Sequence, residues 1–135
     1  MKKIALDTNI FRQIDFINFL IKNVNKFKVF LPSIVGLELG YFRSLKEISW
    51  DEFNQYLSKF NGSIMSWESL KSAEIIENAK KNKQRLSFSQ HFRDFIIGTQ
   101  CLSQNVDLIT NNVEHFFWVT SIKVQTPEEF FSEYK

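Results

Sequence analysis

Cysteine, proline and glycine are all scarce in this sequence, and each scarcity excludes a class of protein. The 135 residues include one cysteine, two prolines and four glycines. Cys101 has no partner for an intrachain disulfide, so we expect a small buried hydrophobe in a reducing, cytoplasmic protein. The low proline and glycine content excludes collagen-like repeats and low-complexity or loop-rich chains. The sequence therefore indicates a packed globular protein.

Long hydrophobic runs are also lacking. The N-terminus begins like a signal peptide, with two lysines before an apolar stretch, but Asp7 ends that stretch after three residues. A secretion signal or a membrane span needs a much longer apolar core. We expect neither export nor a membrane partner.

Apolar residues are abundant, whereas net charge is small. Hydrophobic residues make up 44% of the chain, fifteen residues are phenylalanine, and the formal net charge is +2. This length suffices for one domain with a substantial core and is too short for two ordinary ones. We therefore expect a single domain over residues 1–135. The net charge alone does not indicate a nucleic-acid-binding protein.

One segment is nevertheless strongly basic. Residues 80–93 contain no acid, and the cationic side chains there are Lys80, Lys81, Lys83, Arg85, His91 and Arg93. Such a stretch is either a solvated helix end, whose cations complement the helix dipole, or a rim that binds phosphates. The sequence leaves both open.

Short apolar segments alternate with segments of helical periodicity. The pattern predicts strands at 3–7, 28–31, 63–66, 107–110 and 122–125, and helices at 8–25, from 33 onward, at 50–60, 66–81 and 89–103, and after 126. Ser33 is the expected cap of the second helix, with Ile34, Val35, Leu37 and Tyr41 on its inner side. Alternation of this kind implies a parallel sheet covered by helices on both faces. Ligands of such sheets bind beyond the carboxyl ends of the strands, where Asp7 and the turn 110–112 fall.

Three carboxylates stand beside strongly apolar stretches. Asp7 closes the first strand, Glu38 lies between Leu37 and Leu39, and Asp94 lies inside a predicted helix. Taken singly, Asp7 is explained by helix capping and Glu38 by a solvent-facing position, although aspartate is a poor helix former at the position of Asp94. Several acids that converge from distant parts of a chain are best explained by a divalent metal. Removing one acid from such a cluster should relieve repulsion and leave the metal-free protein at least as stable.

In their order and spacing, four segments resemble the PIN-domain family of metal-dependent ribonucleases, and within it the short toxins of the VapC type. The matching segments are 6–10, 31–40, 93–102 and 108–116. The resemblance implies a PIN-like three-layer α/β/α domain, with a short parallel sheet and helices on both faces. It covers nearly the whole chain, except residues 50–87.

The resemblance also implies a site. Asp7, Glu38 and Asp94 would ligate Mg²⁺ or Mn²⁺, and Asn112 would join the catalytic set where the family often has a fourth acid. This amide favours a one-metal site. Supporting or phosphate-contacting roles fall to Thr8, Asn9 and Thr110. If the basic stretch is a phosphate-binding rim, then Lys80, Lys81, Lys83, Arg85 and Arg93 would contact RNA. His91 and His115 have no zinc-type spacing, and we expect them at the surface or the edge of the core.

The expected function is that of a metal-dependent endoribonuclease, the toxin of a toxin–antitoxin pair, with RNA as substrate and a cognate antitoxin protein as partner. The alternative is a catalytically impaired PIN-fold domain that binds RNA or protein, since Asn112 is not an acid. The three retained carboxylates count against that decay. A phosphate-accepting receiver domain would need a lysine after a late strand, and residues 124–126 offer none.

Homodimerisation is a further expectation that the sequence leaves open. The aromatic side chains available for a self-association surface are Phe53, Tyr56, Phe60 and Trp67, although aromatic residues at helical spacing more often belong to the core.

Overall fold

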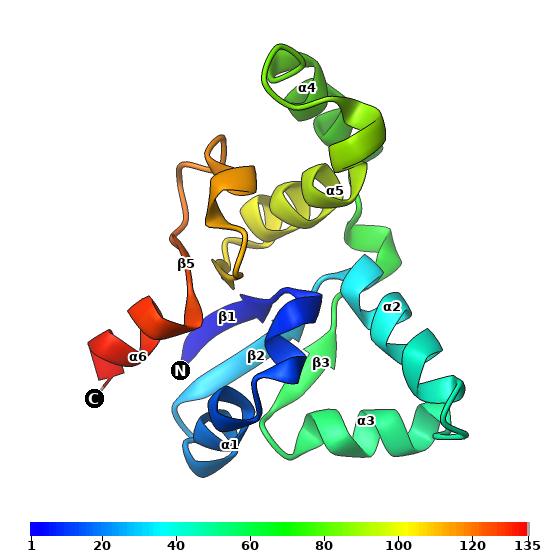
Figure 1. Ribbon diagram of the computed structural model, residues 1–135, viewed down its shortest axis with the longest axis vertical. Helices are drawn as coiled ribbons and strands as arrows, with labels where there is room; N and C mark the ends of the chain where they lie inside the picture. The colour runs from blue at the N-terminus through cyan, green and yellow to red at the C-terminus, as the bar shows by residue number, and fades with distance from the viewer. Residues whose placement is uncertain (135) are drawn as a thin grey trace.

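The computed structural model describes residues 1–134, which form one parallel five-stranded sheet (Figure 1). The strands are β1 (Lys2–Leu6), β2 (Phe27–Leu31), β3 (Gly62–Ile64), β4 (Asp107–Ile109) and β5 (Val124–Gln125). Their spatial order is β3-β2-β1-β4-β5, and all four neighbouring pairs are parallel. The α/β fold class predicted from the sequence is confirmed.

Helices fill the connections between the strands. The α-helices are α1 (Ile14–Lys22), α2 (Ser33–Ser44), α3 (Trp50–Ser58), α4 (Ser72–Lys81), α5 (Phe88–Gln104) and α6 (Pro127–Tyr134). Three short 3₁₀ helices are η1 (Thr8–Arg12), η2 (Trp67–Ser69) and η3 (Val113–Phe116). Asn105 ends α5 in the left-handed conformation, with φ 54°, which asparagine tolerates better than most residues.

The order of the strands places helices on both faces. The chain moves outward from β1 to β3 and then returns to place β4 and β5 on the other side of β1. Because parallel crossovers are right-handed, the helices of the outward path and those of the return path cover opposite faces. In Figure 1, α4 and α5 accordingly lie above the sheet, and α1 and α3 lie below it.

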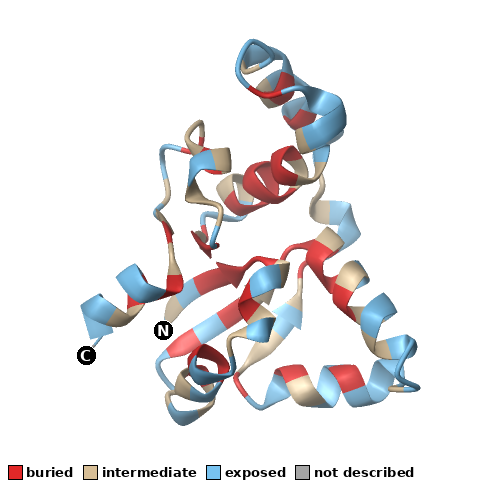
Figure 2. Cartoon of the chain, viewed as in Figure 1, coloured by how far each residue is buried: buried red, intermediate tan, exposed pale blue. Residues whose placement is uncertain are grey.

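The core lies between these layers. The central strands are buried on both sides, as the red bands of Figure 2 show, and Ile4, Ala5 and Leu6 have no exposed surface. A cluster of phenylalanine rings fixes the C-terminal helix, because Phe130 of α6 lies 5.8 Å from Phe16 of α1 between ring centroids. Aromatic pairs at this spacing add to the free energy gained by burying their area.

Two predicted helices are each divided in the structure. Gln13, with φ −90° and ψ 85°, separates η1 from α1, so residues 8–25 do not form one helix. Ile10 and Phe16 are buried on either side of that break, which is why the apolar periodicity continued across it. Extended residues 70 and 71 likewise separate η2 from α4, and Ser66 caps η2 instead of a helix reaching Lys81.

The expected caps have different outcomes. Thr126 and Glu129 exchange the hydrogen bonds of a capping box at the start of α6, as predicted. Ser33 makes no cap, because its hydroxyl donates to the carbonyl of Met65. The buried side chain of Gln100 accepts instead from the backbone N–H of Ser33 at 2.8 Å. The start of α2 is thereby attached to the middle of α5.

The inner side of α2 agrees with the prediction only in part. Val35 is buried as expected, and Leu39 is buried as well, whereas Leu37 and Tyr41 are more than half exposed. Among the aromatic residues considered for self-association, Phe53 and Phe60 are buried in the core, and Trp67 is exposed. Within residues 1–134, every helix falls short of the length and apolarity that crossing a bilayer requires.

The environment of Cys101 gives a first prediction. The thiol is completely buried, and this burial raises its pKa above the ordinary range. We expect iodoacetamide to leave Cys101 unmodified in the native protein at neutral pH and to alkylate it fully in denaturant, as followed by intact-mass spectrometry. Rapid native labelling would contradict the packing of α5 against the sheet.

Candidate active site

The candidate site lies at the switch point of the sheet, where successive strands stop being added on one side of β1 and are added on the other. This switch point falls between β1 and β4, and Asp7 and Thr110 directly follow these two strands. Crevices at such points, beyond the carboxyl ends of the strands, are the usual ligand sites of open α/β sheets. The structure therefore brings together two residues that are 103 positions apart.

Asp7 is almost completely buried and fully hydrogen-bonded. Its Oδ1 accepts from the backbone N–H of Thr8 at 2.7 Å, as in a helix cap, and from the Arg93 guanidinium at 2.8 Å. Its Oδ2 accepts from the hydroxyl of Thr110 at 2.8 Å. Burying a carboxylate to 1% exposure is costly without such partners. Asp7 therefore caps η1 and also belongs to a charged cluster.

Glu38 reaches the same place from α2. Its carboxylate accepts from the Thr8 hydroxyl at 2.8 Å and from Nε of Arg93 at 2.9 and 3.0 Å. Gln100 determines where this helix begins, since it holds the Ser33 N–H and hydroxyl at 2.8 and 2.7 Å. The attachment of α2 to α5 thus places Glu38 opposite Arg93.

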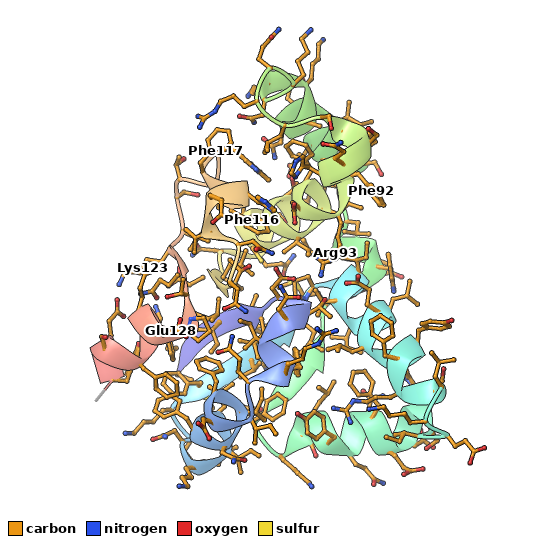
Figure 3. The ribbon with its side chains drawn as sticks, viewed as in Figure 1. Phe92, Arg93, Phe116, Phe117, Lys123 and Glu128 are labelled. Carbon is orange, nitrogen blue, oxygen red and sulfur yellow. The ribbon has the colours of Figure 1, made fainter. Side chains whose placement is uncertain are left out.

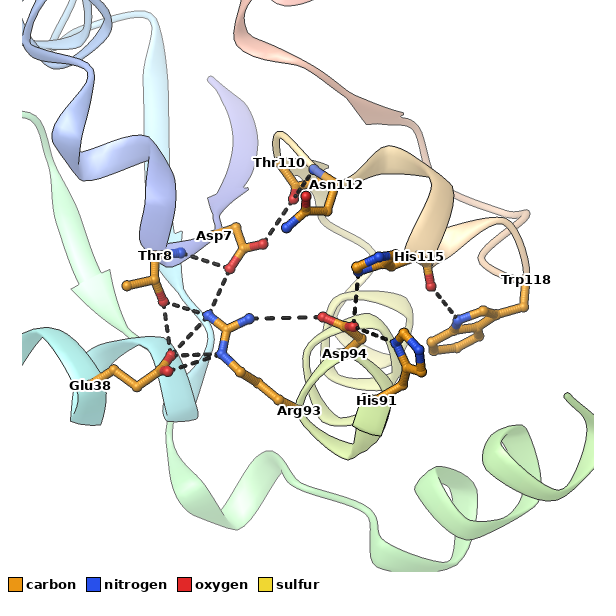
Figure 4. Close-up of polar contacts among 10 residues, drawn as sticks. All are labelled: Asp7, Thr8, Glu38, His91, Arg93, Asp94, Thr110, Asn112, His115 and Trp118. Atoms are coloured by element: carbon orange, nitrogen blue, oxygen red, sulfur yellow. Dashed lines mark hydrogen bonds and ion pairs between the residues drawn. The ribbon is translucent and has the colours of Figure 1, made fainter. Parts of the chain in front are cut away.

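The guanidinium of Arg93 is the centre of the cluster (Figures 3 and 4). It lies 2.8 Å from Asp7 and 2.9 Å from Glu38, and its Nη1 lies 3.8 Å from Oδ1 of Asp94. The three acids predicted to converge do so, around a cation of the chain itself. Burial lowers the pKa of Arg93, but hydrogen bonds to Glu38 and the charge of Asp7 outweigh it and raise that pKa above its usual value.

The donor set suits a hard divalent cation. Three carboxylates face the guanidinium of Arg93, which supplies the compensating charge, and the hydroxyls of Thr8 and Thr110 hydrogen-bond Glu38 and Asp7. Three negative charges face a single positive one, so the cluster keeps an excess of negative charge. Oxygen ligands of this kind are those that Mg²⁺ and Mn²⁺ prefer.

Asp94 faces two ways. Its Oδ1 is the oxygen nearest Arg93, whereas its Oδ2 lies 3.2 Å from Nδ1 of His91 and 3.3 Å from Nδ1 of His115. Both imidazoles are half-buried at the edge of the site, in keeping with the expected position at the edge of the core. Their convergence on one carboxylate was not foreseen from the sequence, because the two histidines are 24 positions apart.

The remaining predicted residues are more dispersed. Asn112 lies beside Thr110, and its backbone N–H donates to the Thr110 hydroxyl at 3.1 Å (Figure 4). Asn9 is exposed and makes no side-chain hydrogen bond within residues 1–134. Lys80, Lys81 and Lys83 are exposed around the end of α4, at the tip of the molecule in Figure 1. Arg85 covers the ring of Phe117 at 3.8 Å, which indicates a packing role.

The sequence reasoning missed a second basic surface. A groove of about 230 Å³ opens beside Thr8, and Arg12, Phe42 and Lys46 are among its lining residues. The cations come from η1 and from the turn after α2, so no charged run in the sequence indicated them. Arg43 also lines the groove, but its guanidinium stacks on Tyr56 at 4.2 Å.

Comparisons with known proteins agree with this architecture. A chain of the VapBC2 complex from Rickettsia felis, crystallised with a DNA fragment from its promoter, matches with a TM-score of 0.64 and 21% identity, over 92% of this chain and 98% of that one. A chain of VapBC-1 from nontypeable Haemophilus influenzae matches with a TM-score of 0.64 and 18% identity, over 93% and 98%. This chain has the fold of these VapBC chains.

That likeness confirms the fold that the resemblance to VapC-type PIN domains implied. It covers nearly the whole length of both matched chains, so residues 50–87, which carry no motif, belong to the same architecture. No family model matches the sequence. No curated protein matches it either.

Proposed function

We propose that this protein is a metal-dependent endoribonuclease, the toxin of a toxin–antitoxin pair. One observation carries the proposal: Asp7, Glu38 and Asp94, from three separate elements, converge on one cation at the switch point of a VapBC-type fold. A shared fold alone does not establish an activity, so the proposal rests on this arrangement of acids.

Asp7, Glu38 and Asp94 would hold Mg²⁺ or Mn²⁺, and the bound ion would supply charge neutralisation at a phosphodiester and a more acidic water. The chain's other groups orient these ligands. Thr110 donates to Oδ2 of Asp7, and Thr8 donates to Glu38, which fixes the direction of both carboxylates. Asn112, next to Thr110, offers a neutral amide at the same edge.

Arg93 has two roles in this proposal. In the metal-free protein its guanidinium neutralises the acids, so it must move before these carboxylates can bind a metal ion. Its side chain lies between Asp7 and Glu38 and remains 28% exposed. A short displacement toward the solvent would therefore bring the guanidinium to an incoming phosphate. A guanidinium fork matches phosphate as well as carboxylate. Arg93 would thus exchange one anionic partner for another when RNA binds.

The groove beside Thr8 is a suitable path for the RNA backbone. Arg12 and Lys46 provide charge there, and Phe11 and Phe42 provide aromatic faces for stacking. It begins at a residue that hydrogen-bonds Glu38, so a strand lying in it would reach the acids.

A protein partner is the other part of the proposal. The matched structures are VapBC complexes, and the outer side of α2 exposes an apolar surface made up of Leu37, Tyr41, Phe42 and Leu45. Exposed apolar clusters of this kind commonly mark protein interaction sites. A cognate antitoxin that covers α2 would also close the approach to Glu38, which lies on the same helix.

The alternative function is that of an impaired PIN-fold binding domain. It is favoured by the guanidinium at the position expected for the metal and by an amide at residue 112. Metal-dependent cleavage separates the two functions.

We expect the purified, tag-free chain to cut single-stranded RNA in Mn²⁺ or Mg²⁺ and to lose this activity in excess chelator. Glu38→Gln should lower the cleavage rate by about a hundredfold or more, since the site would lose a charged metal ligand. Glu114→Gln, which removes an exposed acid outside the cluster, is the matched control. Gel analysis of a labelled RNA measures both, and cleavage that persists in chelator would refute the metal-dependent mechanism.

The two basic surfaces can be compared by the salt dependence of RNA binding. Neutralising Arg12 and Lys46 together should reduce the slope of log affinity against log salt by about one unit per lost phosphate contact. The same change at Lys80, Lys81 and Lys83, on the tip of the molecule, should have a smaller effect. Fluorescence anisotropy in chelator measures both slopes, and the reverse order would assign the RNA path to the basic stretch 80–93.

A further inference from the structure

A second group of metal-binding side chains lies next to the carboxylate cluster, on the other side of Asp94. It consists of His91, Asp94 and His115, whose potential ligand atoms all lie within 4.8 Å of one another. His91 and Asp94 belong to α5, and His115 belongs to η3 (Figure 4). The chain has only these two histidines, and both point at the same carboxylate.

The fold holds the three side chains in place. His91, Asp94 and Gly98 lie at helical positions i, i+3 and i+7, on one side of α5. A Cβ at Gly98 would lie 2.5 Å from the ring of Trp118, so only glycine lets the segment after β4 approach this closely. Nε1 of Trp118 then donates to the backbone carbonyl of His115 at 3.0 Å. His115 is thereby fixed opposite Asp94.

The spacing of the donor atoms suits a small ion. Nδ1 of His91 and Nδ1 of His115 lie 3.2 and 3.3 Å from Oδ2 of Asp94. Zinc binds nitrogen and oxygen at about 2.0–2.2 Å, so the edges of its tetrahedron measure roughly 3.3–3.5 Å. The third edge, between the ligand atoms of the two histidines, is at most 4.8 Å long.

Hydrogen bonding alone does not explain the arrangement. His91 has hydrogen-bond geometry toward Oδ2, whereas His115 is close to the same oxygen without it. Oδ1, which could accept a second imidazole, faces Arg93 instead. Two nitrogens and one carboxylate oxygen therefore lie close together. As metal ligands, two neutral imidazoles and one carboxylate would give a donor set of charge −1.

We propose that His91, Asp94 and His115 bind a divalent transition-metal ion, with Zn²⁺ as the expected ion, through Nδ1, Oδ2 and Nδ1. Imidazole nitrogens favour zinc, cobalt and nickel over magnesium, so this site differs in selectivity from the all-oxygen cluster around Arg93. Three protein ligands leave a fourth position, which the partly exposed imidazoles leave open to solvent. Zinc binding here does not depend on RNA cleavage.

The ion would join α5 to η3 and fix the orientation of Asp94. With Oδ2 held between the histidines, Oδ1 stays directed at Arg93, so one carboxylate serves two neighbouring cation positions. Zn²⁺ is therefore expected to raise the melting temperature, because it would bind the folded state and link α5 to η3.

The test uses the full chain without a polyhistidine tag, stripped of metal, in titration calorimetry with Zn²⁺. We expect one equivalent to bind, and His91→Gln and His115→Gln each to weaken binding by about tenfold or more, since loss of even an outer-shell partner costs that much. Co²⁺ as a second probe should give visible ligand-field absorption that both variants lose. Melting curves in chelator verify that the variants fold. In NMR spectra of the wild type, both imidazole signals should shift when Zn²⁺ is added.

Two controls separate this site from the carboxylate cluster. Glu38→Gln should bind Zn²⁺ as the parent does, and so should Glu114→Gln, which removes the exposed acid beside His115. Loss of Zn²⁺ in Glu38→Gln with retention in both histidine variants would place the ion among the acids and overturn the proposal. Absence of Zn²⁺ binding, or imidazole signals that do not move, would reduce the cluster to hydrogen bonding. Because no RNA is present, a chain without nuclease activity would still give a clear answer.

Discussion

Arg93→Met should lower the free energy of unfolding in chelator by about 2–3 kcal/mol, because it leaves buried Asp7 and half-buried Glu38 without their shared cation. The same substitution should strengthen Mn²⁺ binding by about tenfold or more, since three close carboxylates attract a divalent ion and no guanidinium has to be displaced. Methionine keeps the apolar stem of the arginine, so packing changes little. Urea unfolding and Mn²⁺ calorimetry measure the two effects.

Arg93→Lys is the matched control. Lysine keeps the positive charge but not the planar fork that contacts Asp7 and Glu38 at once, so both effects should be intermediate. A methionine variant that is less stable yet binds Mn²⁺ no better would mean that Arg93 is a structural ion-pair partner only. A variant as stable as the parent would show that the guanidinium does not neutralise the acids.

The opposite signs of the two effects follow from one cause. In the proposed mechanism, Arg93 and a divalent ion would compete for the same carboxylates, so the group that stabilises the metal-free protein is the one that metal binding would have to displace. Such competition lowers the apparent affinity for the ion. The apparent affinity equals the intrinsic affinity multiplied by the fraction of molecules in which the acids are free. An incoming RNA phosphate that pairs with Arg93 would release the acids, and substrate and metal would then bind cooperatively.

Much of the fold could be predicted from the sequence. Apolar segments such as 28–31 have the length and composition of buried strands, and their alternation with helices requires a parallel sheet. The switch point beside Asp7 then follows from topology. The breaks at Gln13 and at residues 70–71 could not be predicted, because the apolar periodicity continues across the first and the residues at the second have no strong preference against a helix.

The arrangement within the site was only partly predictable. Three acids were expected to converge on a cation, and they do, but Arg93 was assigned to an RNA-binding rim. Arg93 and Asp94 are neighbours on α5 and point about 100° apart, so one faces Asp7 and the other faces the histidines. Which residue faces which side depends on how α5 is rotated against the sheet, and that rotation is determined by distant contacts such as Gly98 on Trp118.

The outward face of α2 has a similar explanation. Leu37 and Tyr41 were expected to be buried because they are apolar, yet the Gln100 hydrogen bonds to Ser33 set the helix so that Val35 and Leu39 face inward. A burial pattern follows from tertiary contacts as well as from composition. The exposed residues are then available to a partner.

Asp7→Asn gives the second large effect and reverses an expectation drawn from sequence alone. Relief of repulsion predicts a metal-free variant at least as stable as the parent, but the structure pairs Asp7 with Arg93 and hydrogen-bonds it to Thr8 and Thr110. The variant should lose about 2 kcal/mol of unfolding free energy in chelator, since an amide offers one acceptor oxygen and no charge. Mn²⁺ binding and RNA cleavage should be lost with it.

A double-mutant cycle identifies the cause of that loss. If the interaction with Arg93 is responsible, Asp7→Asn in the Arg93→Met background should cost much less than in the parent, with a coupling energy of about 1–2 kcal/mol in urea unfolding. Thr110→Val, which removes a different hydrogen bond to Asp7, is the comparison, and its cost should persist in both backgrounds. Strictly additive effects of the residue 7 and residue 93 substitutions would assign the loss to the hydrogen bonds with Thr8 and Thr110 instead. Only an Asp7→Asn variant at least as stable as the parent would restore the original expectation.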